Sequence, residues 1–131
     1  MTRILIVDDD VIQLELMAEI LKQAFPDFEI LTAPSLTEAK KTLEKLRVVS
    51  LVVTDYKLND GTGYQLLKFC SEVLTNVPVI IITAFGNDEN EEVRAALSFR
   101  KGAFDFLKKP LDFDELIERV RHALRIAEDL A

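Results

Sequence analysis

Five residues carry groups that could do chemistry: Asp8, Asp9, Asp55, Thr83 and Lys109. Each lies at or just beyond the end of a short apolar run that is typical of a buried strand. Open α/β sheets bind their ligands at the carboxyl ends of the strands, which is where these residues fall. Several carboxylates with few cations around them suit a hard divalent ion such as Mg²⁺. With that charge neutralised, Asp55 could attack a phosphoryl group and form an acyl phosphate.

Each residue also has an ordinary structural explanation when it is taken alone. Asp8 and Asp9 could complement the dipole of a following helix. Thr83 could be a plain β-branched strand residue, and Lys109 could be surface charge. Asp55 could simply end its strand and shape a turn. The occurrence of all of them at one edge of one predicted sheet favours a functional site.

Strands and helices alternate five times along the chain. Strands are predicted at residues 2–7, 28–33, 48–55, 79–82 and 103–107, and helices at 11–24, 36–47, 64–74 and 112–131. A less clearly patterned helix, which follows the polar segment 85–92 and ends at residue 101, is predicted as well. Capping pairs mark most helix starts: Asp10 with Gln13, Ser35 with Glu38, Thr62 with Gln65, and Asp112 with Glu115. A polar loop containing Asn59, Asp60 and Gly61 separates the third strand from its helix.

This alternation predicts an α/β fold, with a parallel five-stranded sheet between two layers of helices. In a doubly wound (βα)5 sheet of the flavodoxin-like order 2-1-3-4-5, the ends of the first and third strands are neighbours. Asp8 and Asp9 are then expected to face Asp55. Lys109 and the Thr83 hydroxyl are expected beside a bound phosphoryl group, where they would help to neutralise it.

Composition restricts the class of protein further. The 131 residues suffice for one domain with its own core, and neither a signal peptide nor a membrane anchor is recognised, so a cytoplasmic location is expected. The single cysteine, Cys70, cannot form an internal disulfide and is interpreted as an inert thiol in the core or at its boundary. A net charge of −7 argues against direct nucleic-acid binding. Phosphoryl transfer of this kind needs no general base, so the site does not require a histidine. The lone His122 is therefore interpreted as a surface residue.

The chain resembles the receiver domain of bacterial two-component response regulators over essentially all 131 residues. The motifs that carry the resemblance are Ile-Leu-Ile-Val-Asp-Asp-Asp at 4–10, Asp-Tyr-Lys-Leu-Asn-Asp-Gly-Thr-Gly at 55–63, Val-Ile-Ile-Ile-Thr-Ala at 79–84 and Gly-Ala-Phe-Asp-Phe-Leu-Lys-Lys-Pro-Leu at 102–111. The last motif, with Thr-Ala-Phe-Gly upstream, is similar to receivers of sigma-54-dependent (NtrC-type) transcriptional activators.

The resemblance implies a role for each site residue. Asp55 is the phosphoacceptor and Asp8 and Asp9 form the acidic pocket. Mg²⁺ would be bound by Asp9, Asp55 and the carbonyl of Lys57. The phosphoryl-binding and switch positions are Thr83, Ala84, Lys109 and Phe106, and the peptide bond to Pro110 is expected to be cis. Phe106 lacks a hydroxyl, so any signal through it must come from ring packing, and a plain core role for it stays open.

Three departures from the family pattern stand out. Asn59 replaces the usual proline, which predicts a less rigid loop. Lys57 and Phe85 occupy positions that in this family influence hydrolysis of the acyl phosphate, and a bulky Phe85 predicts a long-lived phosphoryl state. The segment 87–100 is longer than typical and belongs to the fourth-helix region, the family's output surface.

The resemblance implies a signalling domain rather than an enzyme, one that catalyses only its own phosphorylation and dephosphorylation. A histidine kinase or phosphotransfer protein would supply the phosphoryl group. The surface around the fourth helix, fifth strand and fifth helix would then control an output such as transcription. Residues 1–131 are expected to form a single domain, with 112–131 the last helix and the possible start of a linker to an output domain. A homodimer through the fourth or fifth helix stays open.

Other classes of protein fit the residues less well. A phosphatase of the haloacid dehalogenase type needs a second aspartate where this chain has Lys57. A flavodoxin-like cofactor binder would offer hydroxyls and glycines, rather than aspartates, to a phosphate. A pseudo-receiver that acts only as a protein-interaction module is expected to lack Asp55 or Lys109, and both are present. A stand-alone receiver or phosphorelay intermediate remains an alternative to a transcriptional regulator.

Overall fold

The structure, a computed structural model, describes residues 1–74, 77–84 and 103–130. Its elements in chain order are β1 (Arg3–Val7), α1 (Val11–Ala24), β2 (Glu29–Ala33), α2 (Leu36–Leu46), β3 (Leu51–Asp55), β4 (Lys57–Leu58), β5 (Gly61–Thr62), α3 (Gly63–Val73), β6 (Val79–Thr83), β7 (Ala103–Lys108) and α5 (Phe113–Leu130). Three predictions lie outside the described residues: the helix that ends at residue 101, the long segment 87–100 and the position of Phe85.

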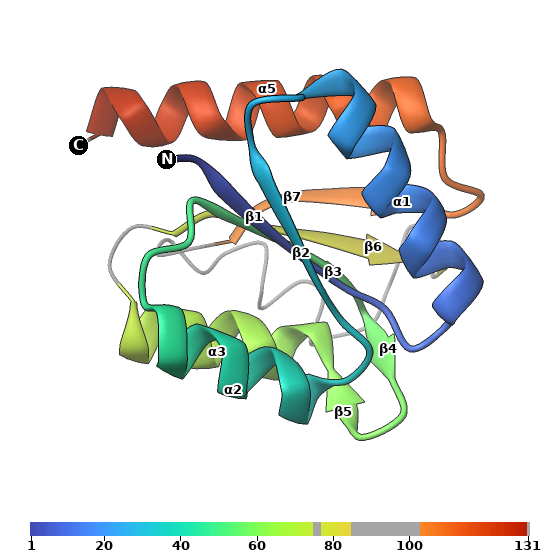
Figure 1. Ribbon diagram of the computed structural model, residues 1–131. Helices are drawn as coiled ribbons and strands as arrows, with labels where there is room; N and C mark the ends of the chain where they lie inside the picture. Colours follow the sequence, from blue (N-terminus) through green and yellow to red (C-terminus); the bar gives the residue numbers. More distant parts are fainter. Residues whose placement is uncertain (75–76, 85–102, 131) are drawn as a thin grey trace.

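Five parallel strands form one sheet in the order β2-β1-β3-β6-β7, which confirms the predicted doubly wound order. Figure 1 shows α1 and α5 on one face of this sheet and α2 and α3 on the other. The three-layer α/β prediction is therefore confirmed. No helix in the described part of the chain is both long and apolar enough to cross a membrane.

Strand residues supply the core to both faces, because successive side chains of a strand point to opposite sides of the sheet. In β1, Ile4 and Ile6 pack toward α1 and α5, where Leu14, Met17, Leu21, Leu116 and Val120 are buried. Leu5 and Val7 pack on the other face with the buried residues Leu36, Ala39, Leu43, Leu66, Leu67 and Cys70. Both faces of the sheet are thus covered, as the β-branched runs predict.

Several element boundaries differ from the predictions, most of them by a single residue. The third strand begins at Leu51 instead of residue 48, and Val48 is exposed. The second helix ends at Leu46, because Arg47 adopts the left-handed conformation of a C-cap (φ 57°). The loop predicted after Asp55 contains a short antiparallel hairpin, in which Lys57 pairs with Thr62 and Leu58 with Gly61.

Candidate functional site

The register of the parallel strands brings the predicted site residues to one edge. Val7 pairs with Thr54 across β1 and β3, so the residues that follow, Asp8 and Asp55, emerge side by side. Asp55 pairs in turn with Ile82 of β6, the residue before Thr83. Thr83 pairs with Lys108 of β7, the residue before Lys109. Four strand ends therefore meet where the sheet order predicts a binding site.

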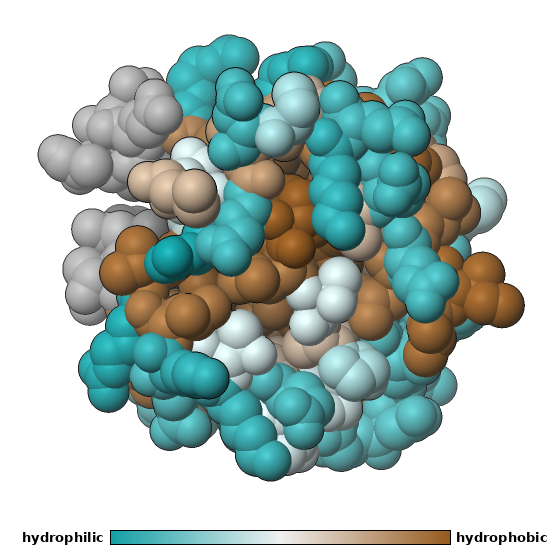
Figure 2. Space-filling model, in the orientation of Figure 1, coloured by the Kyte–Doolittle hydropathy of each residue, from teal (hydrophilic) through white to brown (hydrophobic). Residues whose placement is uncertain are grey.

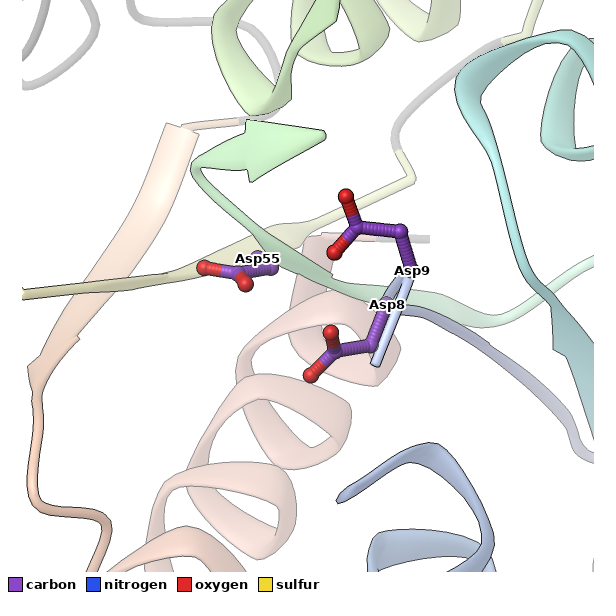
Figure 3. A group of neighbouring side chains, drawn as sticks. All are labelled: Asp8, Asp9 and Asp55. Atoms are coloured by element: carbon purple, nitrogen blue, oxygen red, sulfur yellow. The ribbon is translucent and has the colours of Figure 1, made fainter. Parts of the chain in front are cut away.

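Three carboxylates gather at this edge. One oxygen from each of Asp8, Asp9 and Asp55 lies within 4.8 Å of the others. Figure 3 shows Asp8 and Asp9 projecting from the end of β1 beside Asp55. Asp8 and Asp55 are 2% and 6% exposed, whereas Asp9 is half-buried. The predicted meeting of Asp8 and Asp9 with Asp55 is present in the structure.

Burial makes ionised Asp8 unfavourable and raises its pKa to about 6. The charges of Asp55 and Asp9 push the pKa further up. The backbone N–H of Asp10, which donates to Asp8 Oδ1 at 2.9 Å, and the charge of Lys109 oppose this shift. The ionised form of Asp8 therefore remains less favourable than that of a carboxyl group in water.

Lys109 provides the positive group facing the cluster. Its Nζ lies 3.0 Å from Oδ2 of Asp55, and its side chain is 37% exposed while that of Asp55 is 8% exposed. The backbone N–H of Lys109 donates to the carbonyl of Thr83 at 2.9 Å, and Thr83 is buried. The Lys109–Pro110 peptide bond is cis. The ammonium group can thus neutralise charge on Asp55 while it stays accessible to a ligand.

The chain immediately after Asp55 is held tightly against its neighbours. The N–H of Tyr56 donates to the carbonyl of Ile82 at 2.7 Å, and the N–H of Gly63 donates to the carbonyl of Tyr56 at 2.7 Å. A Cβ at Gly63 would lie 2.8 Å from the carbonyl oxygen of Asp55, so this close approach requires glycine. Lys57, in β4, has an exposed side chain.

The remaining candidate residues differ in their burial. Phe106 is half-buried and packs against the core cluster on the α2 and α3 face. Ala84 is exposed directly after Thr83, and His122 is exposed on α5. Cys70 is buried, and its burial raises the thiol pKa to about 12, which agrees with an inert core thiol.

The donor set fits a hard divalent cation. Three carboxylates converge, and the ammonium group of Lys109 contacts one of them, that of Asp55. Oxygen ligands of this kind favour Mg²⁺ or a similar ion over soft metals, which prefer sulfur or imidazole. A bound dication would also favour the ionised form of Asp8, whose pKa is raised by burial first and by the charges of Asp55 and Asp9 second.

Sequence reasoning did not find one residue near the site, Asp60. Its carboxylate accepts hydrogen bonds from the backbone N–H groups of Leu36 and Thr37, both at 2.9 Å, and from the Thr37 hydroxyl at 2.7 Å. An aspartate beside a glycine is typical of a turn, so nothing in the local pattern indicates its distant partners.

The sequence matches the family description "Response regulator receiver domain" over residues 4–121. It is 33% identical over 121 residues to the transcriptional regulatory protein GlrR of Escherichia coli, an alignment that covers 92% of this chain and 26% of that protein. The chain thus spans about a quarter of the length of this relative.

Solved structures agree with the sequence match. A response regulator receiver domain protein from Clostridium thermocellum superposes with a TM-score of 0.85 at 26% identity and covers 100% of both chains. The beryllofluoride-activated NtrC4 receiver domain dimer gives a TM-score of 0.81 at 28% identity, over 97% of this chain and 99% of that one. The resemblance to NtrC-type receivers is therefore supported as well.

Proposed function

We propose, since the chain belongs to the family of response regulator receiver domains of two-component systems, that Asp55 is its phosphoacceptor. The observation that carries the proposal is the Asp8, Asp9 and Asp55 cluster with Lys109 Nζ 3.0 Å from Asp55. A carboxylate that is buried, paired with an ammonium group and next to two further carboxylates is suited to accept a phosphoryl group.

In the proposed reaction, an oxygen of Asp55 attacks the phosphorus of a phosphohistidine in a partner protein. The new O–P bond forms as the P–N bond breaks, and the electron pair stays on the imidazole nitrogen. Lys109 would shift from pairing with the carboxylate to pairing with a phosphoryl oxygen, which needs little movement because its ammonium group is already 3.0 Å away. The Thr83 hydroxyl would donate to another phosphoryl oxygen.

Mg²⁺ is the proposed cofactor, held by Asp9, Asp55 and the backbone carbonyl of Lys57, with Asp8 contributing charge. When bound, it would neutralise the approaching phosphoryl oxygens. The convergence of three carboxylates and the unfavourable ionisation of buried Asp8 support this proposal.

Thr83, Ala84 and Phe106 are the proposed switch positions. Thr83 pairs with Lys108 in the sheet, and Phe106 lies two residues earlier on the same strand. A shift of the Thr83 hydroxyl toward a phosphoryl group could therefore be followed by repacking of the half-buried Phe106 ring. Lys57 and Phe85 are proposed to tune hydrolysis, and an acyl phosphate lifetime of only seconds with Mg²⁺ would contradict the slow hydrolysis expected from Phe85.

The phosphoryl donor is proposed to be a sensor histidine kinase or phosphotransfer protein that docks beside α1. A cavity of about 420 Å³ next to the cluster is lined by Asp8, Lys109, Leu16 and Phe113, among others. Val11, Ile12 and Leu16 of α1 are 54%, 80% and 44% exposed. Figure 2 shows apolar surface at the right edge of the molecule, where Figure 1 places the start of α1. Exposed apolar groups beside the acceptor favour a protein donor.

The output is proposed to be transcription, exerted through a further domain beyond the last helix, because the relative named above is a much longer transcriptional regulator. The domain would act in the cytoplasm, would catalyse only its own phosphorylation and dephosphorylation, and would contact neither nucleic acid nor membrane itself. Dimerisation through the fourth helix or α5 is part of this proposal. A stand-alone receiver, a phosphorelay intermediate and an unphosphorylated pseudo-receiver are the alternatives.

Intact-mass spectrometry after incubation with acetyl phosphate tests the acceptor. A gain of one phosphoryl group that requires Mg²⁺ and is absent in Asp55→Asn is expected. Asp105→Asn is the matched control, because Asp105 lies on β7, pairs with Arg119 of α5 and is not part of the carboxylate cluster. If the folded wild-type protein gains no mass, the domain acts by binding alone.

A further inference from the structure

Asp60 joins two parts of the molecule that are remote in sequence. It lies at the tip of the β4–β5 hairpin, and both of its carboxylate oxygens bind the first turn of α2. The Thr37 hydroxyl adds a third bond to the same carboxylate. These bonds, of which the Thr37 hydroxyl contributes most, lower the pKa of Asp60 to about 2, so the carboxylate is ionised at neutral pH.

The start of α2 already has a local cap. Ser35 is already the N-cap of α2 and accepts a hydrogen bond from the N–H of Glu38 at 3.0 Å. Asp60 instead takes the N–H groups of Leu36 and Thr37, which Ser35 leaves for another acceptor. The same helix start thus has a local cap and a second one supplied by the hairpin.

The hairpin is fixed at its other end to α3 and to the site. Thr62 caps α3 in a reciprocal pair with Gln65, and Gly63 donates to the carbonyl of Tyr56. Gly61 lies so close to Leu36 and Gln65 that a Cβ there would collide with both side chains. The hairpin tip is therefore seated between the starts of α2 and α3.

The hairpin connects Asp60 to the segment that follows Asp55. Only Tyr56 separates Asp55 from Lys57, and Lys57 opens the hairpin that Asp60 closes. Asn59 fixes no backbone angle where the family usually has proline, so restraint of this loop must come from its contacts. We propose that Asp60 is a positioning residue of the phosphoacceptor site, which holds the Asp55–Lys57 backbone in place by anchoring the hairpin to α2. This inference rests on the proposed function.

Paired variants separate positioning from simple helix stability. Asp60→Ala removes the anchor, whereas Ser35→Ala removes a cap from the same helix without touching the hairpin. Mg²⁺ affinity is measured by calorimetric titration, and stability by urea unfolding. We expect Asp60→Ala to weaken Mg²⁺ binding roughly tenfold, as loss of a residue that orients a metal ligand does. Ser35→Ala is expected to lower stability comparably and to leave Mg²⁺ affinity unchanged.

Asp60→Asn keeps one acceptor oxygen and should give an intermediate affinity, which also covers the case that Asp60→Ala does not fold. Hydrogen exchange of the Gly63 amide provides a readout that needs no metal: exchange should accelerate in Asp60→Ala but not in Ser35→Ala. Equal Mg²⁺ affinity in Asp60→Ala and Ser35→Ala would overturn the inference. A wild-type protein that binds no Mg²⁺ and takes no phosphoryl group would instead overturn the proposed function, while the exchange of Gly63 would still decide whether Asp60 anchors the hairpin.

Discussion

The ionised side chain of Asp8 lowers the stability of the folded protein. The residue is 2% exposed, and burial, together with two neighbouring carboxylates, raises the pKa of its side chain to about 6. At neutral pH the folded protein must therefore hold an ionised group that would be better solvated in the unfolded chain. The Asp10 N–H and Lys109 offset only part of this cost. A cation bound beside Asp8 would stabilise its ionised form and reduce this cost.

The raised pKa of Asp8 predicts how stability depends on pH without divalent ions. The folded chain binds the Asp8 proton more tightly than the unfolded chain, whose value is near 3.8. The contribution of Asp8 to the free energy of unfolding should therefore fall as pH rises from about 4 to about 6, and stay low above it. Asp8→Asn removes this titration. At pH 7.5 the free energy of unfolding of the variant should exceed that of the wild type by at most about 3 kcal/mol. Urea unfolding in EDTA across this pH range measures the difference, and parallel profiles would contradict the assignment.

Residue by residue, the sequence indicates those site groups that end a strand. Asp8, Asp55 and Lys109 could be predicted because each follows an apolar run whose end is visible in the sequence. Asp60 could not, because its partners Leu36 and Thr37 are 24 and 23 residues away and no periodicity relates them. Contacts of this kind depend on how two loops meet after the sheet has formed.

At the scale of elements, the passage from β3 to α3 decides where Asp55 lies. The sequence predicts a polar loop there, and the structure has a hairpin of two-residue strands. Strands this short show no alternation of apolar and polar residues, so pattern analysis cannot find them. The capping pair Thr62 and Gln65, by contrast, was predictable from spacing alone and is present with both hydrogen bonds.

Two glycines in this passage should differ in their tolerance of a side chain. Gly63→Ala places a Cβ 2.8 Å from the carbonyl oxygen of Asp55, and a strand backbone cannot easily yield. We expect it to lower the free energy of unfolding by about 1–3 kcal/mol and to slow phosphorylation by acetyl phosphate. Gly61→Ala meets only the side chains of Gln65 and Leu36, which can move, so its loss should be smaller. Urea unfolding of both variants tests this, and a larger loss for Gly61→Ala would refute the explanation.

At the scale of the whole molecule, parallel topology concentrates charge. All five strands of the main sheet run the same way, so their carboxyl ends share one edge. The alternating strands and helices predicted this order, because parallel strands need crossover connections and right-handed crossovers leave few arrangements. The donor protein and the output are not encoded in that pattern, since they depend on surface residues whose partners lie in other molecules.

The same concentration of charge predicts that Mg²⁺ stabilises the entire domain. The chain carries a net charge of −7, and three of its carboxylates lie within 4.8 Å of one another only when the sheet is formed. An ion that binds the folded state alone should raise the free energy of unfolding by about 2.7 kcal/mol at a hundredfold excess over its dissociation constant. Urea unfolding at increasing MgCl₂ measures this, with NaCl at equal ionic strength as the control for general screening. Asp9→Asn should flatten the response to Mg²⁺ but keep the response to NaCl, because it removes a ligand and leaves most of the net charge. Equal stabilisation by the two salts would show that Mg²⁺ acts only by screening the acidic surface and that the cluster binds no ion.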